Sequence, residues 1–169
     1  IPTTRFDPAS VALLKYLPAA TGSGIYSFQK PTAQDFDEFV GRYDQELNSH
    51  DRYTMRYYRN EFANAGVLNL QNLTTYADES NILYQNALIS ETHTFSDSLL
   101  NNFILSYQRE GSVRGPLSGS IDVADLGVNI WQPAFKSIQS IGVSGYFSIG
   151  DNPHATFKRS NMTLADDLH

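Results

Sequence analysis

The stretch that decides the fold is DEFVGRYDQELNSHDRYTMRYYRN, residues 37–60. Aromatic and apolar side chains take one parity of this stretch, and charged side chains take the other. Four polar residues, 48–51, interrupt the alternation, which then resumes. Strict alternation predicts half-buried β-strands, and two such runs around a short polar break predict a β-hairpin. We therefore expect antiparallel strands at residues 39–47 and 52–62.

The charged parity of this hairpin carries Arg42, Asp44, Glu46 and Arg56. Two carboxylates at positions i and i+2 are compatible with acid–base chemistry. Charge along one parity of a strand is also typical of a wall that borders water, and we favour this interpretation. Opposite charges meet if Asp44 faces Arg56, whereas a slide of two residues opposes Arg42 to Arg56. We expect the first of these registers.

The same pattern recurs at residues 85–95 and 99–109 around a three-residue turn, 96–98, and a further alternating run starts at residue 161. The predicted strands, 9 to 11 residues long, match the length that crosses a bilayer as a tilted strand. Short turns that alternate with long loops are typical of outer-membrane barrels. We therefore expect an all-β fold, whose antiparallel hairpins form part of a large transmembrane β-barrel with long extracellular loops. The sheets of soluble sandwiches alternate in the same way, so a secreted, lectin-like β-sandwich binding module is the alternative.

Two segments outside the strands have patterns of their own. Residues 7–18, DPASVALLKYLP, begin with an N-cap-like Asp and a Pro at the first helical position, which predicts one short helix near the N-terminus. Residues 110–159 hold 7 of the 11 glycines and the only tryptophan. This long segment is expected to be a functional extracellular loop, in which residues 143–148, VSGYFS, form a short strand.

Aromatic residues in the long segment are our candidate ligand-binding residues: Trp131, Phe135, Tyr146 and Phe147. They either form a small core of the loop or present a surface that contacts an extracellular solute. The sequence holds no motif for a nucleophilic enzyme, and its four histidines have no ligand spacing, so we expect no enzyme, no cofactor and no metal site. A net charge of −6 argues against a nucleic-acid partner. The absence of cysteine excludes a disulfide framework.

Long phrases of the chain resemble the barrel of TonB-dependent outer-membrane receptors of the Oar-like type, which carry a carboxypeptidase-regulatory-like domain. The phrases are YSFQKPTAQDFDEFVGRYDQELNSHDRYTMRYYRNEF, QNALISETHTFSDSLLNNFILSYQRE and ADLGVNIWQP, and RFDPASVALLKYLP resembles a loop helix of that group. The resemblance runs over nearly all 169 residues. It implies that residues 1–169 are a partial barrel domain with four complete strands and the start of a fifth, the plug being absent. It also implies a bacterial outer-membrane location, contact with outer-membrane lipid, uptake or binding of an unknown extracellular solute, and contact with TonB through a missing part of the chain.

Overall fold

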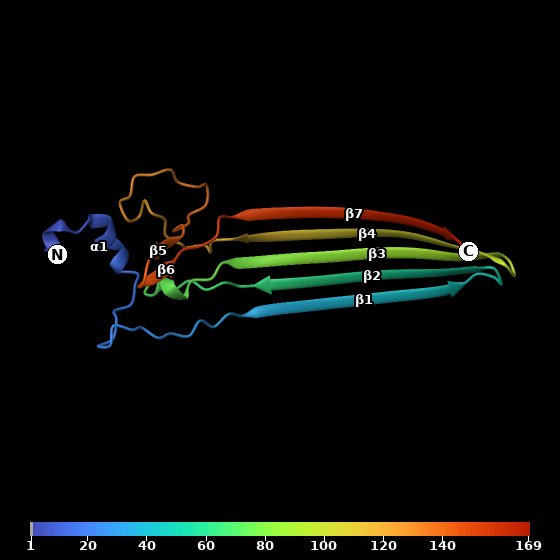
Figure 1. Cartoon of the computed structure of the whole chain (residues 1–169), viewed down its shortest axis with the longest axis horizontal. Helices are drawn as coiled ribbons and strands as arrows, with labels where there is room; N and C mark the ends of the chain where they lie inside the picture. The colour runs from blue at the N-terminus through green and yellow to red at the C-terminus, as the bar shows by residue number, and fades with distance from the viewer. Residues whose placement is uncertain (1) are drawn as a thin grey trace. The chain divides into compact units, whose positions relative to one another are not determined.

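A computed structural model describes residues 2–169. Its main element is a five-stranded sheet with the strand order β1-β2-β3-β4-β7, in which neighbouring strands run antiparallel (Figure 1). The strands are β1 (Gln34–Glu46), β2 (Asp51–Asn64), β3 (Glu79–Ser96), β4 (Leu99–Gly115) and β7 (Ala155–Leu168). A second sheet pairs β5 (Ile141–Val143) with β6 (Phe147–Ile149). The helices are the 3-10 turns η1 (Thr3–Arg5) and η2 (Leu73–Thr75) and the α-helix α1 (Pro8–Leu14).

The chain divides into two compact units. The wall unit contains most of the five-stranded sheet, residues Asp35–Ala63, Asn81–Ser112 and Thr156–His169. The loop unit contains the N-terminal segment up to Gln34, Asn64–Ser80 and Val113–Ala155. None of the helices in residues 2–169 is long and apolar enough to cross a membrane.

The predicted hairpins are confirmed, and every predicted strand is longer in the structure. The third strand begins at Glu79, six residues before the alternation becomes regular, and the fifth begins at Ala155 rather than at residue 161. The difference has a physical reason, because ladder hydrogen bonds join backbone groups and extend wherever a partner strand continues, whatever the side-chain pattern. The short turns after β1 and β3 lie where the polar breaks predict them.

The predicted register of the first hairpin is wrong. The Leu47 N–H donates to the Asp51 carbonyl oxygen over 3.0 Å, which makes these two residues direct partners. Continued along the strands, this register opposes Arg42 to Arg56. Cross-strand contacts agree with it, since the Glu46 carboxylate pairs with Arg52.

Turn chemistry explains the observed register. The Asn48 side chain accepts from the backbone N–H of His50 (2.7 Å) and of Asp51 (2.9 Å), which closes a tight turn directly after β1. The like-charge opposition is offset on the same strand, where Arg42 donates to the Asp44 carboxylate over 2.7 and 2.9 Å. The turn geometry therefore sets the register of the hairpin, and the charged side chains form their ion pairs within that register.

The two faces of the wall unit differ in chemistry. On one face, the rings of Phe39 and Tyr57 lie 6.3 Å apart, and Tyr107 lies within hydrogen-bond distance of Ser160 across β4 and β7. We call this the apolar face; alternation and these contacts assign to it Phe39, Tyr43, Met55, Tyr57, Ile89, Phe103, Leu105, Tyr107, Met162 and Leu164. The opposite, polar face carries the charges of β1 together with Thr54, Asn86, Thr92, Asn102 and Gln108.

Every buried hydrophobic residue of the described chain lies in the loop unit. The apolar face of the wall unit is open instead: Phe39 is 57% exposed and Leu164 is 64% exposed. A soluble sandwich buries one face of each sheet under the other sheet, so the wall unit lacks the core that the sandwich alternative requires. An apolar face of this extent marks a surface for a lipid or protein partner.

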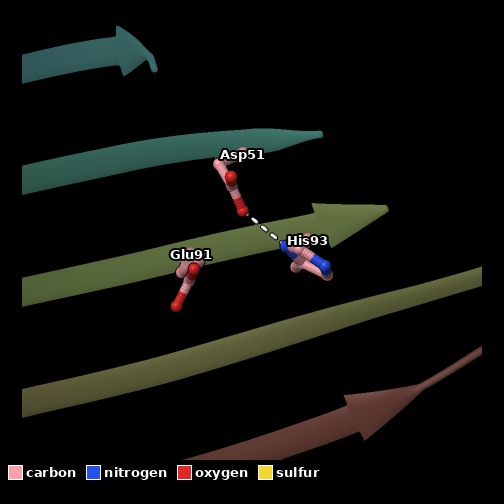
Figure 2. Close-up of side chains that lie close together, drawn as sticks. All are labelled: Asp51, Glu91 and His93. Atoms are coloured by element: carbon pink, nitrogen blue, oxygen red, sulfur yellow. Dashed lines mark hydrogen bonds and ion pairs between the residues drawn. The ribbon is translucent and has the colours of Figure 1, made fainter. Parts of the chain in front are cut away.

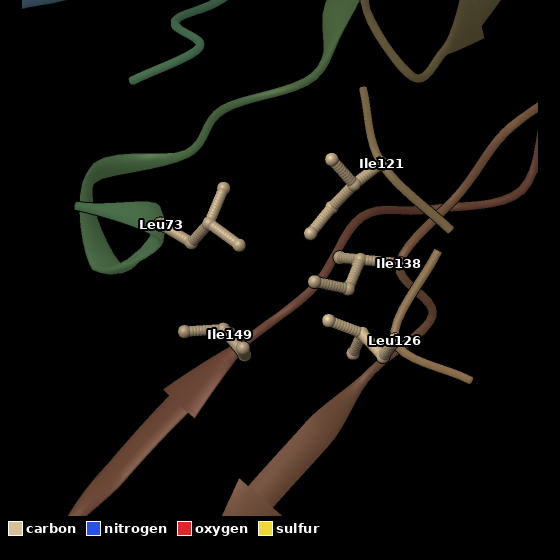
Figure 3. Packing of buried hydrophobic residues seen from close by; sticks show 5 residues of the cluster. All are labelled: Leu73, Ile121, Leu126, Ile138 and Ile149. Atoms are coloured by element: carbon tan, nitrogen blue, oxygen red, sulfur yellow. The ribbon is translucent and has the colours of Figure 1, made fainter. Parts of the chain in front are cut away.

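The loop unit has its own hydrophobic core. Its buried members come from η2, from the long segment after β4 and from β6: Leu73, Ile121, Leu126, Ile138 and Ile149 (Figure 3). The predicted helix is present as α1, and Asp7 caps it by accepting from the Ala9 N–H over 2.9 Å. Residues of α1 pack against the core. The long glycine-rich segment is therefore folded on itself.

The predicted strand at residues 143–148 is wrong in its detail. These residues form the turn of the β5–β6 hairpin, in which Val143 lies opposite Phe147. Gly145 has a φ of 78°, which a turn tolerates and a strand does not. The alternating residue types do indicate β-structure here, but the central glycine places a turn between two three-residue strands.

Candidate functional site

The candidate loop aromatics divide into exposed and packed residues. Trp131 and Tyr146 are the most exposed, at 78% and 86% of their surface. Phe135 is also exposed, at 51%, although its ring stacks on His154 with 4.0 Å between the centroids, whereas Phe147 packs against the core. Of the four, the structure brings only Tyr146 and Phe147 to one hollow. Of the four residues, Phe147 therefore packs against the core and the others are exposed, and contact of the exposed rings with a solute stays a prediction.

That hollow is an aromatic groove of about 440 Å³ on the loop unit. Tyr26 and Phe28 line it as a stacked pair, 5.9 Å between centroids at 25°. The Asn72 amide nitrogen lies 3.3 Å from the Tyr26 hydroxyl and holds that ring to η2. The lining residues are Leu14, Leu17, Pro18, Ala20, Gly24, Tyr26, Phe28, Thr74, Tyr146, Phe147 and Ser148.

The aromatic groove has the chemistry of a binding site. Its lining has no charged side chain and no histidine, and its polar side-chain groups are the hydroxyls of tyrosine, threonine and serine. Aromatic faces and a few hydroxyls are typical of sites that hold a ligand by apolar contact and orient it with hydrogen bonds. Tyr26 and Phe28 escaped the sequence prediction because they precede β1, far from the glycine-rich segment. The phrase YSF, residues 26–28, was the available signal.

The buried carboxylate of Asp151 connects two parts of the long segment after β4 through hydrogen bonds. Asp151 is 9% exposed and accepts hydrogen bonds from the Ser137 hydroxyl and, over 3.2 Å, from the Ile138 N–H. Burial raises the pKa of Asp151 above the ordinary value for an aspartate, and the nearby Asp78 charge adds to the rise. Burial likewise raises the pKa of Tyr76 to about 12, so its hydroxyl stays neutral. These groups hold the loop unit in shape.

The four predicted wall charges lie on the polar face, as the alternation predicts. Arg42 and Asp44 pair along β1, and Thr54 donates to Asp44 over 2.7 Å across to β2. Glu46 pairs with Arg52, and Arg56 lines a shallow hollow with Tyr58 and Tyr84. Their orientation toward a water-filled interior stays a prediction.

The structure also assembles a group that the sequence analysis missed. Asp51 at the start of β2 lies beside Glu91 and His93 of β3, with one possible ligand atom from each within 4.8 Å of the others (Figure 2). Asp51 bonds to the His93 imidazole, and the Tyr53 hydroxyl donates to Glu91 over 2.7 Å. All three side chains are half-buried. They lie at the turn end of the sheet, on the parity of the apolar face.

An antiparallel sheet of long strands, apolar on one face and polar on the other and joined by short turns at one end, defines the class of outer-membrane β-barrels. The family model of the outer membrane beta barrel domain matches residues 1–169, and the chain belongs to this family. Its place is therefore the bacterial outer membrane. No curated protein and no solved structure matches the chain.

Proposed function

We propose that the chain is part of a TonB-dependent outer-membrane receptor of the Oar-like type, which binds and takes up an extracellular solute. The observation that carries the proposal is the aromatic groove on a loop unit with its own core. A porin-like pore needs no folded, hydrophobic recognition surface in its loops, whereas a receptor that captures a scarce solute does. The resemblance of the strand phrases to Oar-like barrels supports the same assignment.

In this proposal, the apolar face of the wall unit contacts lipid and the polar face borders the interior of the barrel. Strands of 13 to 18 residues are more than long enough for the 9 to 11 residues that a tilted strand needs. The proposal includes no catalytic role and no nucleic-acid partner. The net charge of −6 opposes binding to phosphate backbones, and no carboxylate, histidine or lysine lines the aromatic groove.

Capture by TonB tests the proposal. The intact protein that contains these residues is extracted from outer membranes in mild detergent and passed over the immobilised periplasmic domain of TonB from the same bacterium. A TonB-dependent receptor is retained, and an excess of soluble TonB domain elutes it. A protein that stays folded by circular dichroism and passes through unretained is not such a receptor.

Conductance in planar bilayers separates the receptor from a porin. A plugged receptor gives no steady open current, whereas a water-filled pore conducts continuously. Steady current from single inserted molecules would contradict the proposal and favour a diffusion channel.

A further inference from the structure

The group formed by Asp51, Glu91 and His93 has the composition of a metal-binding site. It offers two carboxylates and one imidazole from two adjacent strands (Figure 2). Ligand atoms within 4.8 Å of one another need only small side-chain rotations to reach a common ion, since ligand bonds to zinc are about 2.0–2.2 Å long. We propose that these three side chains bind a divalent transition-metal cation of the zinc type. The proposal is independent of whether the protein is a TonB-dependent receptor.

Each of the three side chains is held by a neighbour outside the group. The Asn48 amide donates to the second oxygen of Asp51 over 2.6 Å, and the Tyr53 hydroxyl donates to Glu91 over 2.7 Å. The ring of Phe95 meets the His93 ring edge-on, with 4.4 Å between centroids. Ligands at metal sites are typically oriented by such second contacts, which keep the ligand atoms aimed at one point.

The donor set selects the class of cation. Calcium and magnesium prefer sites made of oxygen alone, with six or more ligands for calcium. One imidazole nitrogen with two carboxylate oxygens suits zinc and its first-row neighbours, and three protein ligands leave a position for water. The hydrogen bond between Asp51 and the Nδ1 atom of His93 is the contact that the ion would replace, because a neutral imidazole binds an ion through one nitrogen and carries its proton on the other.

The position of the site indicates a structural effect. Asp51 belongs to the hairpin β1–β2, and Glu91 and His93 belong to the hairpin β3–β4. A bound ion would therefore link the two hairpins close to their turns, because β2 begins and β3 ends at this end of the sheet. The short turns of outer-membrane barrels lie at the periplasmic side, so a cation can enter the site from water.

Titration calorimetry with Zn²⁺ tests the proposal on the intact protein in detergent. The test variants are His93→Gln and Glu91→Gln, and the control is His50→Asn. His50 directly precedes Asp51 in the chain, but its ring nitrogen contacts the Thr94 carbonyl oxygen and lies outside the proposed site. We expect His93→Gln either to bind one Zn²⁺ fewer than the wild type or to bind that ion at least about tenfold more weakly. Glu91→Gln should lower the affinity for Zn²⁺ by a similar factor. His50→Asn should bind as the wild type does. Equal binding by wild type and His93→Gln overturns the proposal.

Two further measurements need no variant that risks misfolding. Co²⁺ added to the wild type should give the visible absorption of a nitrogen–oxygen site of low coordination number, which Zn²⁺ then displaces. Ca²⁺ should compete at least tenfold less well than Zn²⁺. Absence of the cobalt band, or Ca²⁺ competing as well as Zn²⁺, overturns the assignment to a transition metal.

Discussion

Replacing Gly150 with alanine is expected to destabilise the loop unit and leave the wall unit unchanged. Gly150 has a φ of 125°, a backbone conformation that residues with a side chain rarely adopt. It lies between Ile149 of the hydrophobic core and the buried Asp151. An added Cβ would lie 2.6 Å from the Cα of Ser140 and closer still to the carbonyl oxygen of Gln139. Both are backbone atoms, so no side-chain rotation relieves the contact.

The magnitude follows from these two effects. A residue forced into such a region of φ and ψ costs of order 1–3 kcal/mol. Relief of the clash requires displacement of residues 139–140, which precede β5, and so disturbs the packing of Ile138 and Ile149. We expect a loss of about 3 kcal/mol or more in the local free energy of unfolding, which is more than about a hundredfold in the opening equilibrium.

Hydrogen exchange followed by mass spectrometry measures this loss in each unit separately. In Gly150→Ala, peptides from residues 137–151 should exchange about a hundredfold faster, and peptides from residues 85–95 should not change. The matched control is Gly142→Ala, in β5 of the same unit, where an added Cβ meets nothing within 4 Å. Equal protection of residues 137–151 in Gly150→Ala and wild type would refute the reasoning.

Three further outcomes are expected of the loop unit. Ile138→Ala, at a core side chain only 3% exposed, should lower the local stability by about 2–5 kcal/mol, as measured by the same exchange experiment. Tyr146→Ala should change it by less than about 0.5 kcal/mol, because that ring is 86% exposed; a larger loss would mean that the ring packs in solution. The pKa of Asp151 is raised on folding, so the folded state holds the proton more tightly than the unfolded state does. The free energy of unfolding of the loop unit should therefore rise as pH falls from neutrality through that raised pKa. Asp151→Asn should abolish this part of the pH dependence. If the free energy of unfolding of the variant changes with pH as in the wild type, another group causes the dependence.

The wall could be predicted from the sequence because a strand's two-residue period is a local property. Phe39 and Tyr43 on one parity and Arg42 and Asp44 on the other already separate the faces, and the structure keeps that separation. The register could not be predicted from charge, because the side chain of Asn48 closes the turn and fixes the pairing. A turn contact of this kind outweighs an exposed charge pair, whose net contribution to stability is small.

The loop unit and the group at the turn end depend on contacts between distant residues. Tyr26 reaches the aromatic groove through its contact with Asn72, 46 positions along the chain. Glu91 and His93 are visible as a pair on one parity, but their partner Asp51 depends on the register between β2 and β3. That register is a tertiary property, so the sequence analysis, which expected no metal site, missed the group.

The central claim is that one face of the wall unit meets lipid and the other meets water. These 169 residues contain no cysteine, so a single cysteine introduced here can carry a spin label. The labelled protein is the intact one, free of other cysteines and reconstituted in bilayers. Labels at Met55 and Leu105 on the apolar face should collide readily with oxygen and poorly with a water-soluble nickel reagent, and labels at Arg56 and Ser106 should show the reverse. Nickel collisions that are equal at neighbouring positions, or higher at Met55 and Leu105, would contradict the account.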